Sequence, residues 1–182
     1  MRVLAISGSL RAESSCTALL QAAALLAPPG VEVVFYDGLA ALPHFNPDLD
    51  TERPPEPVRA LREEIGRSQG LLLSSPEYAR GVAGSFKNAL DWLVGSLQFP
   101  GKPVALLNAS PRARHADAQL RLTLATMSAR LIEEASITLP LLGRNLEAGE
   151  IIADTDLSRL LRAALACFAR HIEAPLFTGT TS

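Results

Sequence analysis

The sequence has 182 residues, of which 48% are hydrophobic and 20% charged, and its net charge is −2 with a pI near 5.9. This balance excludes a disordered chain and a strongly basic nucleic-acid-binding surface, and it suits a single domain over residues 1–182. Cys16 and Cys167 form no C-x-x-C motif, which excludes a disulfide framework and favours a reducing cytoplasm. We expect no metal site and no membrane span, because the histidines lack ligand spacing and no apolar run approaches the ~20 residues of a membrane helix.

The first predicted elements are a buried parallel strand at residues 3–6, a polar loop and a helix. The loop contains Ser9 and Arg11, and either Ser14 or Ser15 can cap the helix. A helix that begins there directs unpaired N–H groups and the positive end of its dipole over the loop, and the guanidinium suits a phosphate. The stretch therefore predicts an anion site, although an ordinary turn between a strand and a helix uses the same residue types.

Three well-known motifs are absent from the sequence. They are the dinucleotide-binding pattern G-x-G-x-x-G, the P-loop pattern G-x-x-x-x-G-K-[ST] and the hydrolase pattern G-x-S-x-G. A loop that uses hydroxyl groups and one arginine suits a monophosphate on a retained cofactor better than a triphosphate that is cleaved.

The chain then alternates between predicted strands and helices. The first helix ends before Pro28, and residues 31–36 form a second strand. Residues 37–57 contain five prolines, so we expect an irregular connection that makes a subunit contact or is a plain surface loop. A helix follows at residues 58–68, and the third strand, at residues 71–74, is apolar throughout, as at the centre of a sheet that is covered on both faces.

The second half of the chain continues the alternation. Its predicted elements are a loop at residues 75–84, a helix at 85–94, a strand at 104–107, a helix with a stripe of Leu120, Leu124, Met127 and Leu131, a strand at 136–139 and a helix at 157–172. Five strands and five helices predict a parallel α/β sandwich of three layers. The flavodoxin-like fold, with a five-stranded parallel sheet of order 2-1-3-4-5, is the example of this class that we adopt as the expected fold. Ligands of such sheets bind beside the switch between strands 1 and 3, here between residues 9–14 and 76–84. We expect residues 178–182 to fray.

Three blocks of sequence occur in a set order within residues 2–110. They are GSLRAES at residues 8–14, PEY at residues 76–78 and GSFKNALDW at residues 84–92. Together they resemble the NADPH-dependent FMN reductases, a flavodoxin-like family of flavin, quinone, azo-dye and chromate reductases. The resemblance implies an FMN cofactor, with NADPH or NADH as the co-substrate that passes hydride through the flavin to a small-molecule electron acceptor.

The resemblance also implies a set of cofactor-binding positions, and it implies no catalytic side chain because the flavin supplies the chemistry. These positions are Ser9, Arg11, Ser14, Ser15, Cys16, Pro76, Glu77, Tyr78, Ala79 and Ser110. The first three of them are implied to bind the FMN phosphate. The segment at residues 76–78 is implied to lie along the isoalloxazine ring, where backbone N–H groups suit the pyrimidine edge and Tyr78 offers apolar area.

The sequence departs from the family pattern at three places. Cys16 stands where many members have Asn, which removes an amide donor from the phosphate site. Ala79 stands where Pro-Glu-Tyr is usually followed by Asn, so a backbone contact would survive there and a side-chain contact would not. Residues 111–115 (PRARH) follow Ser110 in place of glycines. This basic loop covers the ring, meets the 2′-phosphate of NADPH, or is a solvated surface loop.

Three functions are compatible with these observations, and the leading one is an NAD(P)H-dependent FMN reductase. The alternatives are an electron carrier that receives its electrons from a protein partner, and an interaction domain that has lost the flavin. On the helix at residues 84–92, Lys87 and Asp91 are spaced for an ion pair, and Trp92 is an anchor for the core or for a subunit interface. This helix and residues 37–57 favour a homodimer or homotetramer, in which subunit edges complete an open flavin site.

Overall fold

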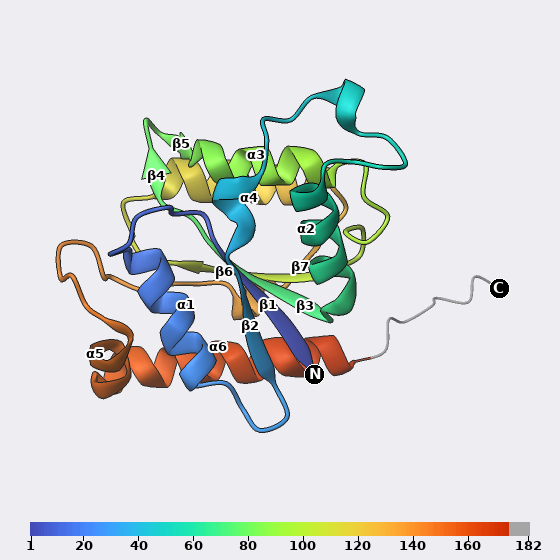
Figure 1. The fold of residues 1–182 in the computed structure, drawn as a ribbon. Coiled ribbons are helices and arrows are strands. Elements are labelled where there is room, and N and C mark those ends of the chain that lie inside the picture. The colour runs from blue at the N-terminus through green and yellow to red at the C-terminus, as the bar shows by residue number, and fades with distance from the viewer. Residues whose placement is uncertain (175–182) are drawn as a thin grey trace.

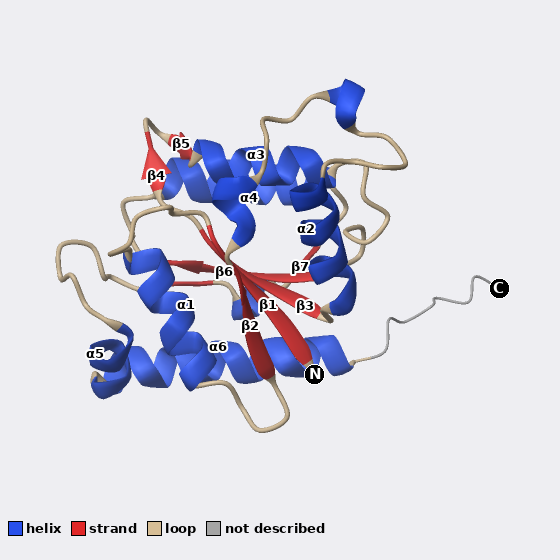
Figure 2. Cartoon of the chain, viewed as in Figure 1, coloured by secondary structure: helices blue, strands red, loops and turns tan. Residues whose placement is uncertain are grey.

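A parallel sheet lies between two layers of helices in the computed structural model, which describes residues 1–174 (Figures 1 and 2). The strand order is β2-β1-β3-β6-β7, with β8 also paired to β6. The predicted order 2-1-3-4-5 is therefore confirmed, whereas the expected fraying of residues 178–182 lies outside the described residues. No helix in the described part of the chain is long and apolar enough to cross a membrane.

The strands are β1 (Arg2–Ser7), β2 (Glu32–Tyr36), β3 (Gly70–Ser74), β4 (Glu77–Tyr78), β5 (Gly81–Val82), β6 (Pro103–Asn108), β7 (Arg130–Leu131) and β8 (Ile137–Thr138). The helices are α1 (Ser15–Leu25), α2 (Glu56–Arg67), α3 (Gly84–Leu93), α4 (Arg114–Thr126), α5 (Ala148–Ala153) and α6 (Thr155–Glu173). Short 3₁₀ turns occur at Gly38–Ala41, Pro47–Leu49 and Glu133–Ala135. The strands of the main sheet pair in parallel, as expected when a helix connects one strand to the next.

The sheet separates two hydrophobic cores, because successive side chains of a strand point to opposite faces. Val3 and Ala5 of β1 pack with α1, α5 and α6, whereas Leu4 and Ile6 pack with α2, α3 and α4. Figure 1 shows the same division, with α1 and α6 on one side of the sheet and α2, α3 and α4 on the other. Every residue of β3 is buried, so the predicted central strand is confirmed.

The edge of the sheet beyond β6 differs from the prediction. A single strand was expected at residues 136–139, but β7 and β8 each contribute two residues and a 3₁₀ turn separates them. The predicted helical stripe is also wrong at its end, because α4 stops at Thr126 and Leu131 lies in β7. Ser128 has a φ of 60°, the left-handed conformation that follows many helices. Glycine usually occupies such a position, so a serine there gives no sequence signal that the helix ends.

The irregular connection at residues 37–57 is anchored to α3. The Trp92 indole N–H and the Asn88 side-chain amide both donate to the Pro43 carbonyl, at 2.7 and 2.9 Å. The Phe45 ring meets Trp92 edge-on with 5.0 Å between ring centroids. Trp92 is fully buried within the chain, so of its two predicted roles the core anchor is confirmed.

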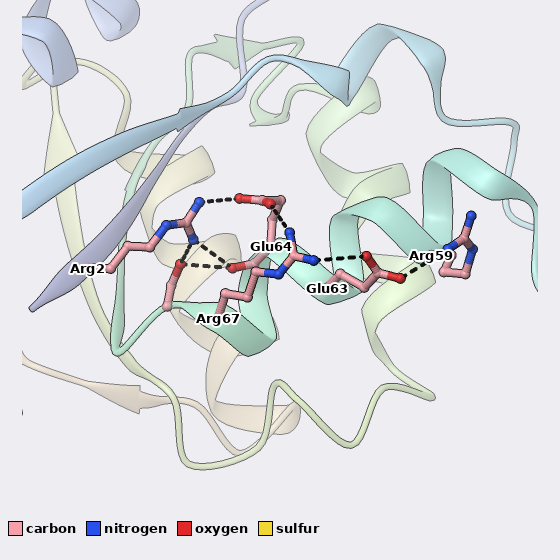
Figure 3. Close-up of polar contacts among 6 residues, drawn as sticks. Arg2, Arg59, Glu63, Glu64 and Arg67 are labelled. Atoms are coloured by element: carbon pink, nitrogen blue, oxygen red, sulfur yellow. Dashed lines mark hydrogen bonds and ion pairs between the residues drawn. The ribbon is translucent and has the colours of Figure 1, made fainter.

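An ion-pair network ties the first strand to α2 (Figure 3). Arg2 donates to the Glu64 carboxylate, which Arg67 also contacts at 3.2 Å. The network continues along the helix through Glu63 to Arg59, at 3.2 Å. Hydrogen bonds to the charged form stabilise it, so the Arg2 contact is the main reason that the pKa of Glu64 lies below its usual value.

Candidate cofactor-binding site

A cleft opens at the carboxyl ends of β1, β3 and β6. Ser7 and Ser74 end neighbouring strands in register, so the loops that follow them emerge at the same edge of the sheet. The cleft has a volume of about 310 Å³, within the range of small-molecule sites. Nine of the ten predicted positions line it, namely Ser9, Arg11, Ser14, Ser15, Cys16, Pro76, Glu77, Tyr78 and Ser110. The predicted crevice thus exists as a physical cavity.

One end of the cleft is the start of α1. Ser14 is the N-cap residue, with a φ of −130° and a hydroxyl that accepts from the Thr17 N–H at 3.5 Å. This settles which of the two candidate serines caps the helix, and Ser15 begins it. The first-turn N–H groups and the positive helix dipole face the loop that carries Arg11, whose side chain is exposed. The arrangement suits an anion.

The loop between β1 and α1 keeps its shape because residue 8 has no side chain. The Gly8 N–H donates to the Ser74 carbonyl at 2.7 Å, which fixes the loop to the end of β3. A Cβ at this position would lie 2.9 Å from Ser75 Oγ and 3.0 Å from Phe86 Cβ. Only glycine therefore lets the loop between β1 and α1 lie this close to both Ser75 and Phe86.

Cys16 lies in the first turn of α1 beneath the loop. It is 5% exposed and belongs to the core, as expected for a small packed residue. Burial raises the pKa of the Cys16 thiol, and the nearby Ser74 and Ser14 hydroxyls lower it by less. A buried neutral thiol is a poor nucleophile, so the cysteine contributes shape to the cleft wall rather than reactivity.

A second wall of the cleft is a small hairpin where a loop was predicted. β4 pairs antiparallel with β5, with Glu77 opposite Val82 and Tyr78 opposite Gly81. The two turn residues, Ala79 and Arg80, have φ values of 49° and 60°. Positive φ at both positions is typical of a two-residue type I′ turn. Tyr78 is 52% exposed on the cleft side, whereas Ala79 lies at the hairpin tip and is the one predicted position outside the cleft lining.

The Glu77 carboxylate is hydrogen-bonded to the start of α4, which is far from it in the sequence. Its Oε2 atom accepts from the backbone N–H groups of His115, at 2.8 Å, and Ala116, at 2.9 Å. The N-cap position of α4 is Ala113, which has no capping side chain. Glu77 thus takes the place of a local cap, a role that the sequence analysis missed. An alanine at the N-cap position was the one signal in the sequence, because alanine cannot accept a hydrogen bond from the first-turn N–H groups of α4.

The charge in the cleft favours an anionic ligand. Arg11 and Arg112 both line it, and among the ion pairs of residues 1–174 neither has a partner. The one acidic residue in the lining is Glu77, whose carboxylate is engaged by α4. The described residues contain no cluster of His, Cys, Asp or Glu that could hold a metal ion.

Some lining residues lie outside the predicted set. They are Ser75, Asn108, Ala109, Arg112, Ala113 and Leu142. Ser75 and Ala109 directly adjoin predicted positions, and Arg112 and Ala113 belong to the basic loop at residues 111–115. Leu142 comes from the segment between β8 and α5, which carries no recognisable motif, so the sequence held no sign of its position.

The block at residues 84–92 is structural. Lys87 and Asp91 form the predicted ion pair, at 2.5 Å. Asn88 accepts from the Phe45 N–H at 2.8 Å and so helps to hold the irregular connection. None of these side chains lines the cleft.

Comparisons with known proteins agree on one family. The family model for NADPH-dependent FMN reductase matches residues 1–141. An NAD(P)H-dependent FMN reductase of Pseudomonas aeruginosa is 41% identical over 112 residues, and a quinone reductase of Pseudomonas putida is 39% identical over 116 residues. These matches cover 60% and 61% of this chain, and the same shares of the two relatives, so the chain spans about 60% of the length of the curated relatives it matches.

The fold comparison extends over nearly the whole chain. The solved structure of FerB, a flavoenzyme NAD(P)H:(acceptor) oxidoreductase of Paracoccus denitrificans, has a TM-score of 0.74 at 28% identity. The match covers 93% of this chain and 98% of that one. The predicted flavodoxin-like three-layer fold is confirmed.

Proposed function

The chain belongs to the NADPH-dependent FMN reductase family, and from this premise we propose that it is an FMN-dependent NAD(P)H oxidoreductase. Its acceptor would be a flavin, a quinone or another small molecule, as the names of its relatives suggest. The observation that carries the proposal is the cleft itself, which joins an anion-binding helix start to the wall formed by the β4–β5 hairpin.

The anionic end of FMN fits the start of α1. Ser9 and Arg11 would contact the phosphate together with the first-turn N–H groups beside Ser14 and Ser15. Cys16 would shape the floor beneath them without an amide donor. The fit rests on the exposed guanidinium and on the absence of a competing carboxylate at this end of the cleft lining.

The ring of FMN fits between the hairpin and the loop after β6. Pro76 and Tyr78 would lie along one side of the ring, and Ser110 would approach it from the other. Ala79 would act through the shape of the hairpin turn, because it lies outside the lining. FMN held there would supply the redox chemistry, which is hydride transfer from NAD(P)H to the acceptor. The side chains bind and orient, and the proposal needs no acid or base among them.

We further propose a single FMN-binding domain over residues 1–182 that acts in the cytoplasm as a homodimer or homotetramer. Two strongly exposed apolar side chains support an assembly: Val94 is 68% exposed and Leu97 is 93% exposed. They follow α3 beside the irregular connection, where a Cβ on Gly95 would lie 2.7 Å from Asp50 Oδ2. Exposed apolar side chains grouped on one surface are typical of protein–protein contacts.

One experiment separates the three functions considered for this chain. FMN is added to the purified protein, flavin fluorescence is followed, and NADPH is then added under anaerobic conditions. Quenching at micromolar FMN followed by rapid bleaching of the flavin absorbance supports the reductase. Quenching without bleaching supports an electron carrier that is reduced by a protein partner, and the absence of quenching supports an interaction domain.

A further inference from the structure

Glu77 connects two walls of the cleft that are far apart in the sequence. It lies in β4, and its carboxylate accepts from the His115 and Ala116 N–H groups at the start of α4. A carboxylate in the first turn of a helix satisfies donors that otherwise lack partners and complements the helix dipole. Because Ala113 offers no capping side chain, this turn depends on a residue 38 positions away.

The hairpin that carries Glu77 has little local stability. Each of its strands has two residues, and a hairpin this short is marginal in water. Its turn places Ala79 and Arg80 at positive φ, which disfavours residues that have a Cβ. The Val82 side chain packs against the core. Apart from the Glu77 contacts, the side-chain hydrogen bond between the hairpin and the rest of the described chain involves Gln119, whose Oε1 accepts from the Val82 N–H at 2.8 Å. Both links run to α4.

The loop before α4 forms the wall that faces this hairpin. Ser110, Arg112 and Ala113 line the cleft. The loop closes on itself through the Ser110 hydroxyl, which accepts from the Arg112 N–H at 3.1 Å, and then enters the turn that Glu77 holds. Of the two α4 links, the Glu77 carboxylate is therefore the one that contacts the turn directly after the Ser110 loop.

We propose that Glu77 is a positioning residue that holds the two ring-facing walls together, acting through the backbone of α4 rather than by contact with the flavin. The inference rests on the proposed function, because the walls would enclose the isoalloxazine ring. It has a specific consequence: loss of the carboxylate weakens binding of the ring, and therefore of FMN and riboflavin equally. Loss of a phosphate contact would instead weaken the binding of FMN and leave the binding of riboflavin unchanged.

The test uses the full chain and a matched control at Asp154. The Asp154 carboxylate also accepts from two first-turn N–H groups, those of Asp156 and Leu157 at 3.1 Å each, but it caps its own helix and lies outside the cleft lining. FMN and riboflavin are titrated separately into the wild type, Glu77→Ala, Glu77→Gln and Asp154→Ala, and the visible circular dichroism of the bound flavin is recorded.

We expect Glu77→Ala to raise the dissociation constants of FMN and riboflavin by the same factor, about tenfold or more, and to change the circular dichroism of the bound ring. Glu77→Gln keeps an acceptor oxygen, so it should recover most of the affinity. Asp154→Ala should lower the thermal midpoint but leave both affinities within about twofold of the wild type.

Other outcomes overturn the proposal in distinguishable ways. If the wild type binds no FMN, the proposed function fails. If the wild type binds FMN but Glu77→Ala behaves like Asp154→Ala, or loses FMN while keeping riboflavin, the positioning role fails. If Glu77→Ala does not fold, Glu77→Asp replaces it, since its carboxylate is one methylene shorter. An equal but smaller loss of both flavins in Glu77→Asp supports the role, and unchanged riboflavin affinity contradicts it.

Discussion

Gly8 shows how one missing side chain shapes the site. A Cβ there would press on Ser75 and Phe86, so we expect Gly8→Ala to lower the free energy of unfolding by about 1–3 kcal/mol and to weaken FMN binding. Gly84→Ala is the control, because a Cβ at Gly84 meets nothing within 4 Å and should change stability by less than about 1 kcal/mol. Urea denaturation of both variants makes the comparison, and equal effects would show that Gly8 is not sterically required.

Ala79 carries a conformational cost that its side chain does not offset. Its φ of 49° is a conformation that Gly and Asn tolerate better than Ala. The Asn that the family resemblance implies at this position would suit the turn through its backbone conformation alone. Ala79→Gly and Ala79→Asn should therefore each raise the free energy of unfolding, by up to about 1 kcal/mol. Unchanged or reduced stability in both variants would contradict the left-handed turn.

At the scale of elements, α3 holds the irregular connection through Asn88. Its side chain donates to the Pro43 carbonyl and accepts from the Phe45 N–H. Asn88→Ala should cost about 1–3 kcal/mol of stability and speed cleavage after the exposed Glu52 by a glutamate-specific protease. Asn46→Ala is the control, because the Asn46 side chain bonds within the same segment, to the Asp48 N–H. Equal cleavage rates in the two variants would contradict the proposal that Asn88 anchors residues 37–57 to α3.

The ion pair between Arg2 of β1 and Glu64 of α2 should make the free energy of unfolding depend on pH in the acid range. The hydrogen bond from Arg2 is the main reason that the pKa of Glu64 is lowered from 4.5. The ionised carboxylate therefore contributes stability that is present above pH 4.5 and is lost as the pH falls through the lower folded-state pKa. Glu64→Gln should be less stable than the wild type at neutral pH, and the difference should shrink below pH 4.5. A constant difference across this range, measured by urea denaturation, would contradict the ion-pair origin.

The sequence-based predictions succeeded where an element had a clear apolar run or a repeating apolar stripe, and failed where it had neither. The strands β1, β3 and β6 followed from apolar runs, the strand order from the flavodoxin-like example, and the position of the cleft from the loops at the carboxyl ends of the strands. The hairpin, α5, β7 and β8 have two to six residues each, too few to show a hydrophobic period. The contact of Glu77 with α4 joins segments 38 residues apart, so the local sequence shows that Ala113 lacks a capping side chain but not which residue replaces it.

In the molecule as a whole, the two ends of one cleft come from segments that are far apart in the chain. The sheet brings the start of α1, with Arg11, to the same edge as the hairpin that carries Tyr78. The parallel register of β1 and β3 makes these segments neighbours, although they are far apart in the chain. The phosphate of FMN would then lie at α1 and its ring at the hairpin, so the two parts of the ligand should respond to different variants.

The most direct test compares the dissociation constants of FMN and riboflavin for the wild type and Arg11→Ala. We expect Arg11→Ala to weaken FMN binding by about tenfold or more and to leave the riboflavin dissociation constant within about twofold of the wild type, because riboflavin lacks the phosphate. An equal loss of both flavins, or no loss of either, would contradict the placement of the phosphate at the start of α1.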